Sequence, residues 1–516
     1  MKKELPLLAV IITVILFFIF FSLPNSRGAK DEHMLFILSQ DENIQYPYLK
    51  KILTPKDNLI STIRNFVGYG HYYYGYPFYV SSALSILPVR VFTGSESSNL
   101  TQLNLYLLRQ IVSVTPLLLS IGVMVYLQTK FQSTIKSIIL FLFIAFLPWI
   151  FKYNLWFWHP DALAALGIVL TIFFLEKDNF KFGKFFLFAA VTCGFVIATK
   201  VIGVFFFLAI MTYLIMGLIK KTVGFKKLLS MAFTFLIIMI AVMILLNPLL
   251  LVERTRRDII DVQKNQYFYV TKGWENDDLY ETGINAWLPY LNDWFVYPQY
   301  LGLLLLLLVL GCFFGNHKLT NVLILAWIIP YSAYLIYFVA IKPYQYWLPI
   351  AIPFFSSAIN LMPNEVFEKG GWKNLSNKRN IHILALSIIQ IITIVILTYS
   401  NVVEDWNIWS KTMDKEPLLL ACNSTPENTN VGEMVFLNED YWYLVESFDN
   451  RISPNSYGYQ AMKGPYKIVS FSNYGEKAWK CMSEDAAIFS AAKHAKYLKI
   501  DYPHYVVYGP DDNEIK

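Results

Sequence analysis

Two adjacent carboxylates, Asp41 and Glu42, follow the first apolar segment of the chain in the run SQDENIQYPY. A carboxylate pair at a membrane surface can serve as a general base, as ligands of a divalent cation, or as both. The same dipeptide is compatible with a solvated acidic turn, and Asp31 and Glu32 form a rival pair closer to the apolar segment. We predict that Asp41 and Glu42 are the catalytic pair.

A second group of ionisable residues lies where other apolar segments begin or end. The run KYNLWFWHPDALAAL contains His159 and Asp161 at the expected start of a helix, with Pro160 suited to its first turn. Asp161 could cap that helix or line a binding site, where His159 would orient a carboxylate or bind a phosphate. Lys200, in GFVIATKVIG, could extend to the membrane surface or face a cavity and bind a lipid phosphate.

Two further stretches could contact a substrate. Arg254, Arg256 and Arg257 follow an apolar segment in NPLLLVERTRRDI, and arginine is well suited to phosphate. We predict phosphate binding by Arg254 and Arg257. The tyrosine-rich run GYGHYYYGYPFYVSS contains Tyr74 and Tyr76, whose rings could stack on a sugar or anchor the chain at the membrane interface.

The composition indicates that lipid is the solvent of most of this chain. Of its 516 residues, 56% are hydrophobic and 16% charged, whereas soluble domains have about 45–50% and about 25%. No basic cluster interleaved with aromatic residues indicates nucleic-acid binding. A phosphate-binding loop, a GxSxG elbow and an HExxH motif are also missing from the sequence. An enzyme of this composition would use a substrate that arrives already activated in the membrane.

About eleven stretches are long and apolar enough, or nearly so, to cross a bilayer, which takes about 20 residues. The first is expected to be an uncleaved anchor, and segment 78–92, interrupted by Pro88 and Arg90, an interfacial helix. The expected spans are 5–23, 104–127, 137–151, 160–175, 185–200, 202–219, 228–251, 298–315, 319–340, 344–361 and 381–399.

Lysine and arginine concentrate in alternate connecting loops, which predicts a cytoplasmic N-terminus. Loops 24–103 and 252–297 and the tail 401–516 would then be extracytoplasmic. The chain is rich in lysine, asparagine, isoleucine and phenylalanine, which is typical of bacterial genomes of low GC content. We therefore expect the plasma or inner membrane of a bacterium. We therefore expect an all-α polytopic membrane domain over 1–400 and a small C-terminal α/β domain over 401–516.

The four cysteines divide between these two predicted parts. Cys193 and Cys312 fall inside apolar segments, where they are expected to be inert packing residues. Cys422 and Cys481 lie in the tail, and a disulfide between them would require that the tail is extracytoplasmic.

Several motifs, taken in order, resemble those of the GT-C superfamily of membrane glycosyltransferases. They are the Asp-Glu pair after the first helix, WHPDALAALGIVLTIFFLEK, GFVIATKVIG, LLNPLLL and IKPYQYWLPIAIPFF, which together cover roughly residues 1–400. The resemblance is to the branch of dolichyl-phosphate-mannose protein mannosyltransferases and the bacterial aminoarabinose transferase of lipid A. It implies a multi-pass enzyme that transfers a sugar from a polyprenyl-phosphate donor. Such an enzyme would be a hexosyl- or pentosyltransferase.

The resemblance also implies roles for the residues in its motifs. Asp41 would be the general base that deprotonates the acceptor hydroxyl, and Glu42 would be its neighbour in the site. His159 and Asp161 would shape the floor of the cavity, and Lys200 would hold the donor phosphate.

The match is imperfect in IKPYQYW, where many relatives have an arginine-tyrosine pair. Tyr344 and Gln345 occupy that stretch, and Gln345 stands where arginine is expected. Lys342 is the substitute that we predict for phosphate binding. No cofactor is certain, and a divalent cation at Asp41 and Glu42 stays open.

The expected function is inverting sugar transfer to an acceptor on the extracytoplasmic side, with membrane lipid around the enzyme. The acceptor could be a protein, a lipid or a glycan. A secondary transporter or translocase of lipid-linked sugar is the main alternative, although neither inverted repeats nor midplane polar residues are evident. A third possible function is that of a receptor or scaffold that uses the tail for recognition.

Overall fold

The structure, a computed structural model, describes most of residues 5–413 and three short strands beyond them. The described residues are 5–23, 25, 40–93, 100–154, 157–273, 281–294, 298–342, 344–361, 378–413, 433–437, 466–470 and 507–508.

Helices make up nearly all of the described part. In the first half of the chain they are α1 (Leu5–Phe17), η1 (Phe18–Ser22), α3 (Gln40–Ile52), α4 (Leu59–Val67), α5 (Tyr76–Thr93), α6 (Thr101–Leu108), η3 (Arg109–Val114), α7 (Thr115–Thr129), α8 (Thr134–Ala145), η4 (Trp149–Asn154), α9 (Asp161–Asp178), α10 (Lys184–Thr199), η5 (Val201–Phe206), α11 (Phe207–Ile219) and α12 (Phe225–Leu246). In the second half they are η6 (Pro248–Leu251), α13 (Glu253–Lys272), α14 (Ile284–Trp294), α15 (Pro298–Phe314), α16 (Lys318–Tyr337), η7 (Tyr344–Trp347), α17 (Leu348–Phe355), η8 (Ser356–Ile359) and α18 (Lys378–Met413).

Six helical stretches of the described residues are long and apolar enough to cross a membrane. The stretch over α12 has a mean hydropathy of 2.8, yet only 6% of its residues are buried inside the protein. Such an uncovered apolar helix requires lipid as its surroundings. The predicted integral membrane protein is thereby confirmed, whereas the predicted number of about eleven spans stays a prediction.

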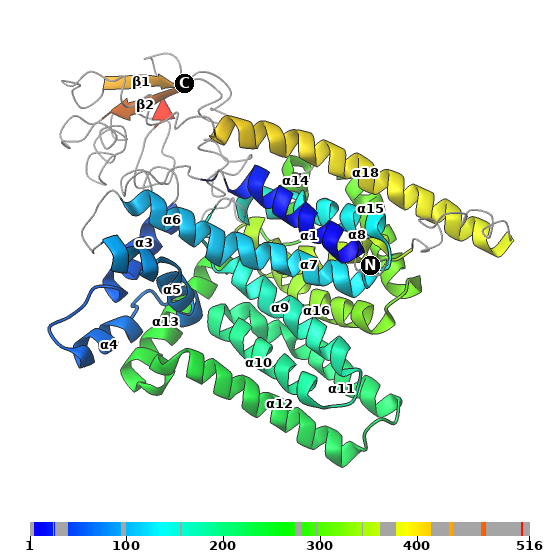
Figure 1. Cartoon of the computed structure of the whole chain (residues 1–516), viewed down its shortest axis with the longest axis horizontal. Helices are drawn as coiled ribbons and strands as arrows, with labels where there is room; N and C mark the ends of the chain where they lie inside the picture. Colours follow the sequence, from blue (N-terminus) through cyan, green and yellow to red (C-terminus); the bar gives the residue numbers. More distant parts are fainter. Residues whose placement is uncertain are drawn as a thin grey trace.

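Helices α7, α9, α10 and α12 lie side by side, with α10 packed between α9 and α12 and with α12 at the edge of the bundle (Figure 1). Two glycines permit this close approach. A Cβ atom on Gly167 of α9 would lie 2.4 Å from Val196 of α10, and one on Gly194 of α10 would lie 2.6 Å from the carbonyl oxygen of Met239 of α12. Small residues at such contacts let membrane helices pack closely.

The two ends of α9 have different surroundings. Near its last turn, Lys130 forms an ion pair of 2.7 Å with Glu176, and Lys177 lies over the Tyr126 ring. Asp161, its first residue, lies about 25 Å away, given 1.5 Å of rise per residue. Helices α3, α4, α5 and α13 gather at the end that contains Asp161 (Figure 1).

The tail contributes a three-stranded antiparallel sheet of β1 (Glu433–Leu437), β2 (Tyr466–Ser470) and β3 (Val507–Tyr508), in the order β1-β2-β3. The expected α/β domain stays a prediction, since the described part of the tail consists of the end of α18 and these strands. Cys422 and Cys481, and the rival acidic pair Asp31 and Glu32, lie outside the described residues. Cys193 and Cys312 are free and buried, as expected for packing residues.

Candidate active site

Asp161 is the centre of a line of polar contacts at one end of the bundle. It is the first residue of α9 and is fully buried. One of its carboxylate oxygens, Oδ1, forms an ion pair with Lys200 Nζ, and the other, Oδ2, contacts His159 Nδ1. Lys200 reaches this point because α10 runs antiparallel beside α9 and ends at Thr199. The Asp161 carboxylate at the start of α9 thus contacts both His159 and Lys200, which follows the end of α10.

His159 links Asp161 to Asp41. Its Nε2 lies 2.8 Å from the Tyr74 hydroxyl and 3.8 Å from Asp41 Oδ2. Its main chain is fixed by Ser113, since the His159 N–H donates to Ser113 Oγ at 3.0 Å. A neutral imidazole whose Nδ1–H faces the Asp161 carboxylate would accept from Tyr74 at Nε2. The described residues therefore bring Asp41, Tyr74, His159, Asp161 and Lys200 together.

The two predicted catalytic carboxylates have different surroundings. The Asp41 side chain is 41% exposed, whereas that of Glu42 is fully buried. Arg109 donates to Glu42 through Nε at 2.9 Å and Nη2 at 2.6 Å, and the main-chain N–H of Trp158 donates to it at 2.7 Å. A buried carboxylate with these donors positions its neighbours. Glu42 holds α3, and with it Asp41, beside the residue that precedes His159.

Sequence analysis did not single out Arg109. It lies in the expected span 104–127, and an arginine within an apolar segment was the signal that could have identified it, because ionisable groups there are costly unless paired.

The tyrosine-rich segment reaches the site through a close main-chain contact at Gly75. The Gly75 N–H donates to the Thr199 carbonyl at 3.0 Å, and a Cβ atom on Gly75 would lie 1.6 Å from the Ala198 carbonyl oxygen. Only glycine fits this approach. Tyr74 therefore faces His159, whereas Tyr76 lies against Tyr69, with 5.5 Å between ring centroids, and belongs to a packing cluster. Tyr76 is not brought to the line of contacts.

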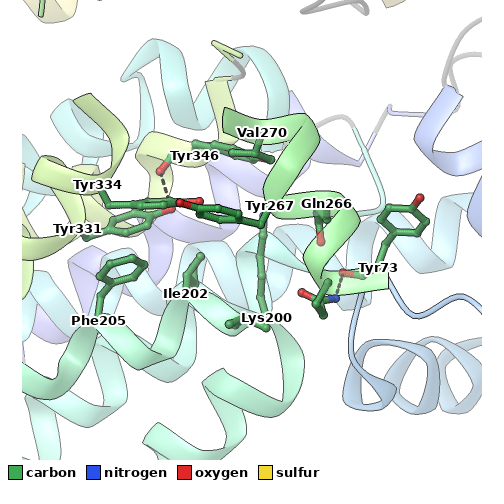
Figure 2. Close-up of a pocket in the computed structure, with 12 residues that line it drawn as sticks. Tyr73, Lys200, Ile202, Phe205, Gln266, Tyr267, Val270, Tyr331, Tyr334 and Tyr346 are labelled. Carbon is green, nitrogen blue, oxygen red and sulfur yellow. Dashed lines mark hydrogen bonds between the residues drawn. The ribbon is translucent and has the colours of Figure 1, made fainter. Parts of the chain in front are cut away.

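A cavity of about 170 Å³ opens beside Lys200. Figure 2 shows that Lys200 extends into it and that Tyr267 of α13 projects towards Tyr331 and Tyr334 of α16. Lys200 Nζ lies 5.0 Å from the centroid of the Tyr346 ring. The lining residues are Tyr73, Lys200, Val201, Ile202, Phe205, Gln263, Gln266, Tyr267, Val270, Tyr331, Tyr334 and Tyr346.

Lys342, predicted to replace a phosphate-binding arginine, has a different environment. Its Nζ donates to the carbonyl oxygens of Glu281 at 2.8 Å, Val339 at 3.1 Å and Ala340, and it lies 4.8 Å from the centroid of the Trp287 ring. Burial lowers the pKa of Lys342 to about 8. Lys342 does not line the described cavity.

The other predicted binding residues are farther from the line of contacts or only partly described. Gln345 is 8% exposed, and the side chain of Tyr344 lies outside the described residues. Arg254 and Arg257 are exposed on α13, where Arg257 pairs with Glu253. Neither arginine lines the described cavity, although Gln263 of the same helix does.

The described residues contain no group of three or more His, Cys, Asp or Glu side chains arranged to hold a metal ion. A divalent cation at Asp41 and Glu42 stays a hypothesis. The carboxylate of Glu42 already accepts hydrogen bonds from Arg109 and Trp158, so these donors would compete with a cation for its oxygens.

Among protein-family models and curated proteins, nothing matches this sequence. Among solved structures, the chain is similar to ArnT from Cupriavidus metallidurans bound to undecaprenyl phosphate, with 10% identity, a TM-score of 0.45 and 98% of each chain covered. The apo state of the same protein gives 11% identity, a TM-score of 0.43 and 97% of each chain.

Proposed function

We propose that this protein is a membrane glycosyltransferase that moves a sugar from a polyprenyl-phosphate donor to an acceptor hydroxyl on the extracytoplasmic side. The observation that carries the proposal is the line of contacts from Asp41 through His159 and Asp161 to Lys200. An accessible carboxylate lies at one of its ends. A lysine beside an aromatic cavity lies at the other.

These two ends match the two charges that develop during sugar transfer. Asp41 takes the proton of the acceptor hydroxyl while the hydroxyl oxygen attacks the anomeric carbon. The bond between that carbon and the phosphate oxygen breaks, and the polyprenyl phosphate leaves with the bonding electrons. Lys200 stabilises the negative charge of this leaving group.

A single displacement with inversion fits the carboxylates of the site. A retaining enzyme needs a second carboxylate that acts as a nucleophile. Glu42 is occupied by Arg109, and Asp161 by Lys200 and His159, and both are buried. Asp41 is therefore the one accessible carboxylate of this line of contacts.

The surroundings of Lys200 suit a lipid-linked phosphate. The Lys200 side chain is 12% exposed, so a phosphate can reach its ammonium while Asp161 keeps it in place. Val201, Val204 and Phe207 follow directly and are 47%, 46% and 59% exposed. These apolar side chains offer a lipid-facing surface along which a polyprenyl chain can lie.

The position of the line of contacts also bears on the alternative of a transporter. Transporters bind their substrates near the bilayer midplane, between broken helices. Asp161 lies at the first residue of α9, at one end of the bundle, which suits chemistry at the membrane surface.

The test is sugar release from a panel of radiolabelled polyprenyl-phosphate sugars by the purified protein in detergent. We expect release from at least one donor, and an inverted anomeric configuration in the product. Binding of a donor without release in the presence of varied hydroxyl acceptors would favour a transporter. A retained configuration would contradict the single displacement.

A further inference from the structure

His71 lies in an aromatic stack beside the helix that carries Asp41. It belongs to the tyrosine-rich segment between α4 and α5 and is 7% exposed. Its ring centroid lies 5.0 Å from that of Tyr48 of α3 and 5.3 Å from that of Tyr73, at interplanar angles of 31° and 37°. Tyr73 in turn lines the Lys200 cavity. The stack therefore lies between Asp41's helix and the cavity.

One ring nitrogen of His71 is fixed by a buried phenol. The Tyr79 hydroxyl lies 2.5 Å from His71 Nδ1, and Tyr79 is fully buried. Burial raises the pKa of Tyr79, so its phenol keeps its proton. Nδ1 is the hydrogen-bond partner that the described residues provide for this hydroxyl. Since a buried donor without an acceptor is costly, Tyr79 donates to Nδ1, and the imidazole proton is on Nε2.

Nε2 of His71 is available to a ligand. No hydrogen bond from Nε2 to the described residues accompanies the Nδ1 contact, and the residue keeps 7% of its surface exposed. Asp41 is close enough to interact with the ring electrostatically. Tyr74 lies between the two histidines of this region, with its ring centroid 5.6 Å from that of His71 and 5.0 Å from that of His159. The His71 ring and the Asp41 carboxylate thus lie within electrostatic range of each other.

We propose that His71 binds the acceptor: its Nε2–H donates to the oxygen of the hydroxyl that Asp41 deprotonates, and the Tyr48–His71–Tyr73 stack contacts the sugar ring that bears this hydroxyl. The proposal rests on the proposed function and adds the acceptor side to it. The hydroxyl proton passes to Asp41, while His71 keeps its own proton throughout. Tyrosine and histidine rings present flat faces that pack on the C–H face of a sugar ring.

The charge of His71 supports this role. Burial lowers its pKa to about 4, although Asp41 opposes the shift. His71 is therefore neutral near pH 7 and donates to a neutral hydroxyl without forming an ion pair with the base. A cationic histidine at this place would instead stabilise the Asp41 carboxylate and weaken it as a base.

The test separates the acceptor side from the donor side. The KM for a radiolabelled polyprenyl-phosphate hexose that the wild type turns over is measured, and so is the KM for n-octyl β-glucoside as the sugar acceptor. The variant His71→Phe keeps a flat ring and loses the donor, whereas His71→Gln keeps an N–H donor. His317→Asn is the matched control, because His317 lies near Lys130 and Glu176 at the other end of the bundle.

For His71→Phe we expect the KM for octyl glucoside to rise about tenfold, as for one lost hydrogen bond, with the KM for the polyprenyl-phosphate donor within about twofold of wild type. His71→Gln should recover part of this loss, and His317→Asn should behave as wild type. Tyr79→Phe, which releases Nδ1, should give a smaller rise in the same KM.

An equal rise of the donor and acceptor KM values in His71→Phe, or no change in either, would overturn the acceptor role and leave the proposed function intact. Absence of turnover of every donor by the wild type would overturn the proposed function, and the acceptor role with it. Should His71→Phe fail to fold, the same comparison is made with His71→Gln and Tyr79→Phe. A rise in their KM for octyl glucoside alone supports the acceptor role, and no change in it contradicts the role.

Discussion

The carboxylate of Glu42 accepts a 2.7 Å hydrogen bond from the main-chain N–H of Trp158, the residue that precedes His159. Through this bond, and through Arg109, the helix that carries Asp41 is fixed against the turn that carries His159. The separation of 3.8 Å between Asp41 and His159 is therefore set by buried groups that need not touch the substrate. The pair Glu42 and Arg109 is a positioning element for the site.

Replacement of Arg109 should destabilise the protein strongly. Arg109→Met leaves the buried Glu42 carboxylate without its main partner, and loss of one member of a buried ion pair costs about 3–5 kcal/mol. The free energy of unfolding in detergent, measured with a chemical denaturant, checks this expectation. Arg257→Met is the control, since that arginine pairs with Glu253 on the surface and should cost less than about 1 kcal/mol. Equal effects would contradict the positioning role.

Gly75→Ala should damage the site without touching its ionisable groups. The added methyl group would lie 1.6 Å from the Ala198 carbonyl oxygen, so the tyrosine-rich segment has to move away from α10 and Lys200. We expect at least a tenfold loss of transfer activity together with a lower Tm. Gly122→Ala in α7 is the matched control, because nothing lies within 4 Å of the added atom there. That control should be neutral or slightly stabilising.

Stability should depend on pH through His71. Its pKa is lowered to about 4 in the folded protein, compared with 6.5 for an unperturbed histidine. Between pH 4 and pH 6.5 this histidine binds a proton in the unfolded chain but not in the folded protein. Its contribution to the free energy of unfolding is therefore fully present above about pH 6.5 and is lost as the pH falls towards 4. The difference between wild type and His71→Gln in the pH dependence of Tm measures this contribution. A difference that grows above pH 6.5 would have the wrong sign.

The phosphate-binding roles can be separated by donor kinetics. Lys200 lines the cavity, so Lys200→Met should raise the KM for the polyprenyl-phosphate donor by about 10–100-fold, and Lys200→Arg by less. Arg254→Met and Arg257→Met should leave this KM within about twofold, because both side chains are exposed on α13 and neither lines the described cavity. The opposite ranking would restore the phosphate-binding role predicted for these arginines.

The membrane character of the chain, and the residues of the central line of contacts, could be predicted because each depends on local sequence. Apolar runs identify membrane helices directly. Asp41, Asp161 and Lys200 can be selected from the sequence because charged residues in or near membrane segments are costly and are therefore candidates for a functional role. The short connection between the expected spans 160–175 and 185–200 predicts that these helices run antiparallel. The contact between Asp161 and Lys200 itself depends on tertiary packing.

The residues that sequence analysis overlooked, or interpreted differently, depend on tertiary contacts. In the sequence, Glu42 and Asp41 are equivalent neighbours. Their different surroundings become apparent only from the burial of Glu42 against Arg109. In the sequence, His71 is one more ring in a tyrosine-rich run, and its proposed role depends on its contact with Tyr79 and on the electrostatic influence of Asp41. Lys342 was predicted from a motif position, whereas its ammonium is surrounded by main-chain carbonyls.

Asp41 as the general base is the central claim, and a charge-removing substitution tests it most directly. Asp41→Asn keeps the size of the side chain, and Asp57→Asn, an exposed aspartate between α3 and α4, is the matched control. Sugar release from the best polyprenyl-phosphate donor should fall by at least about 100-fold in Asp41→Asn, with unchanged donor binding and Tm, and should stay at the wild-type rate in Asp57→Asn. Release by Asp41→Asn at the wild-type rate would contradict the assignment of Asp41 as the base.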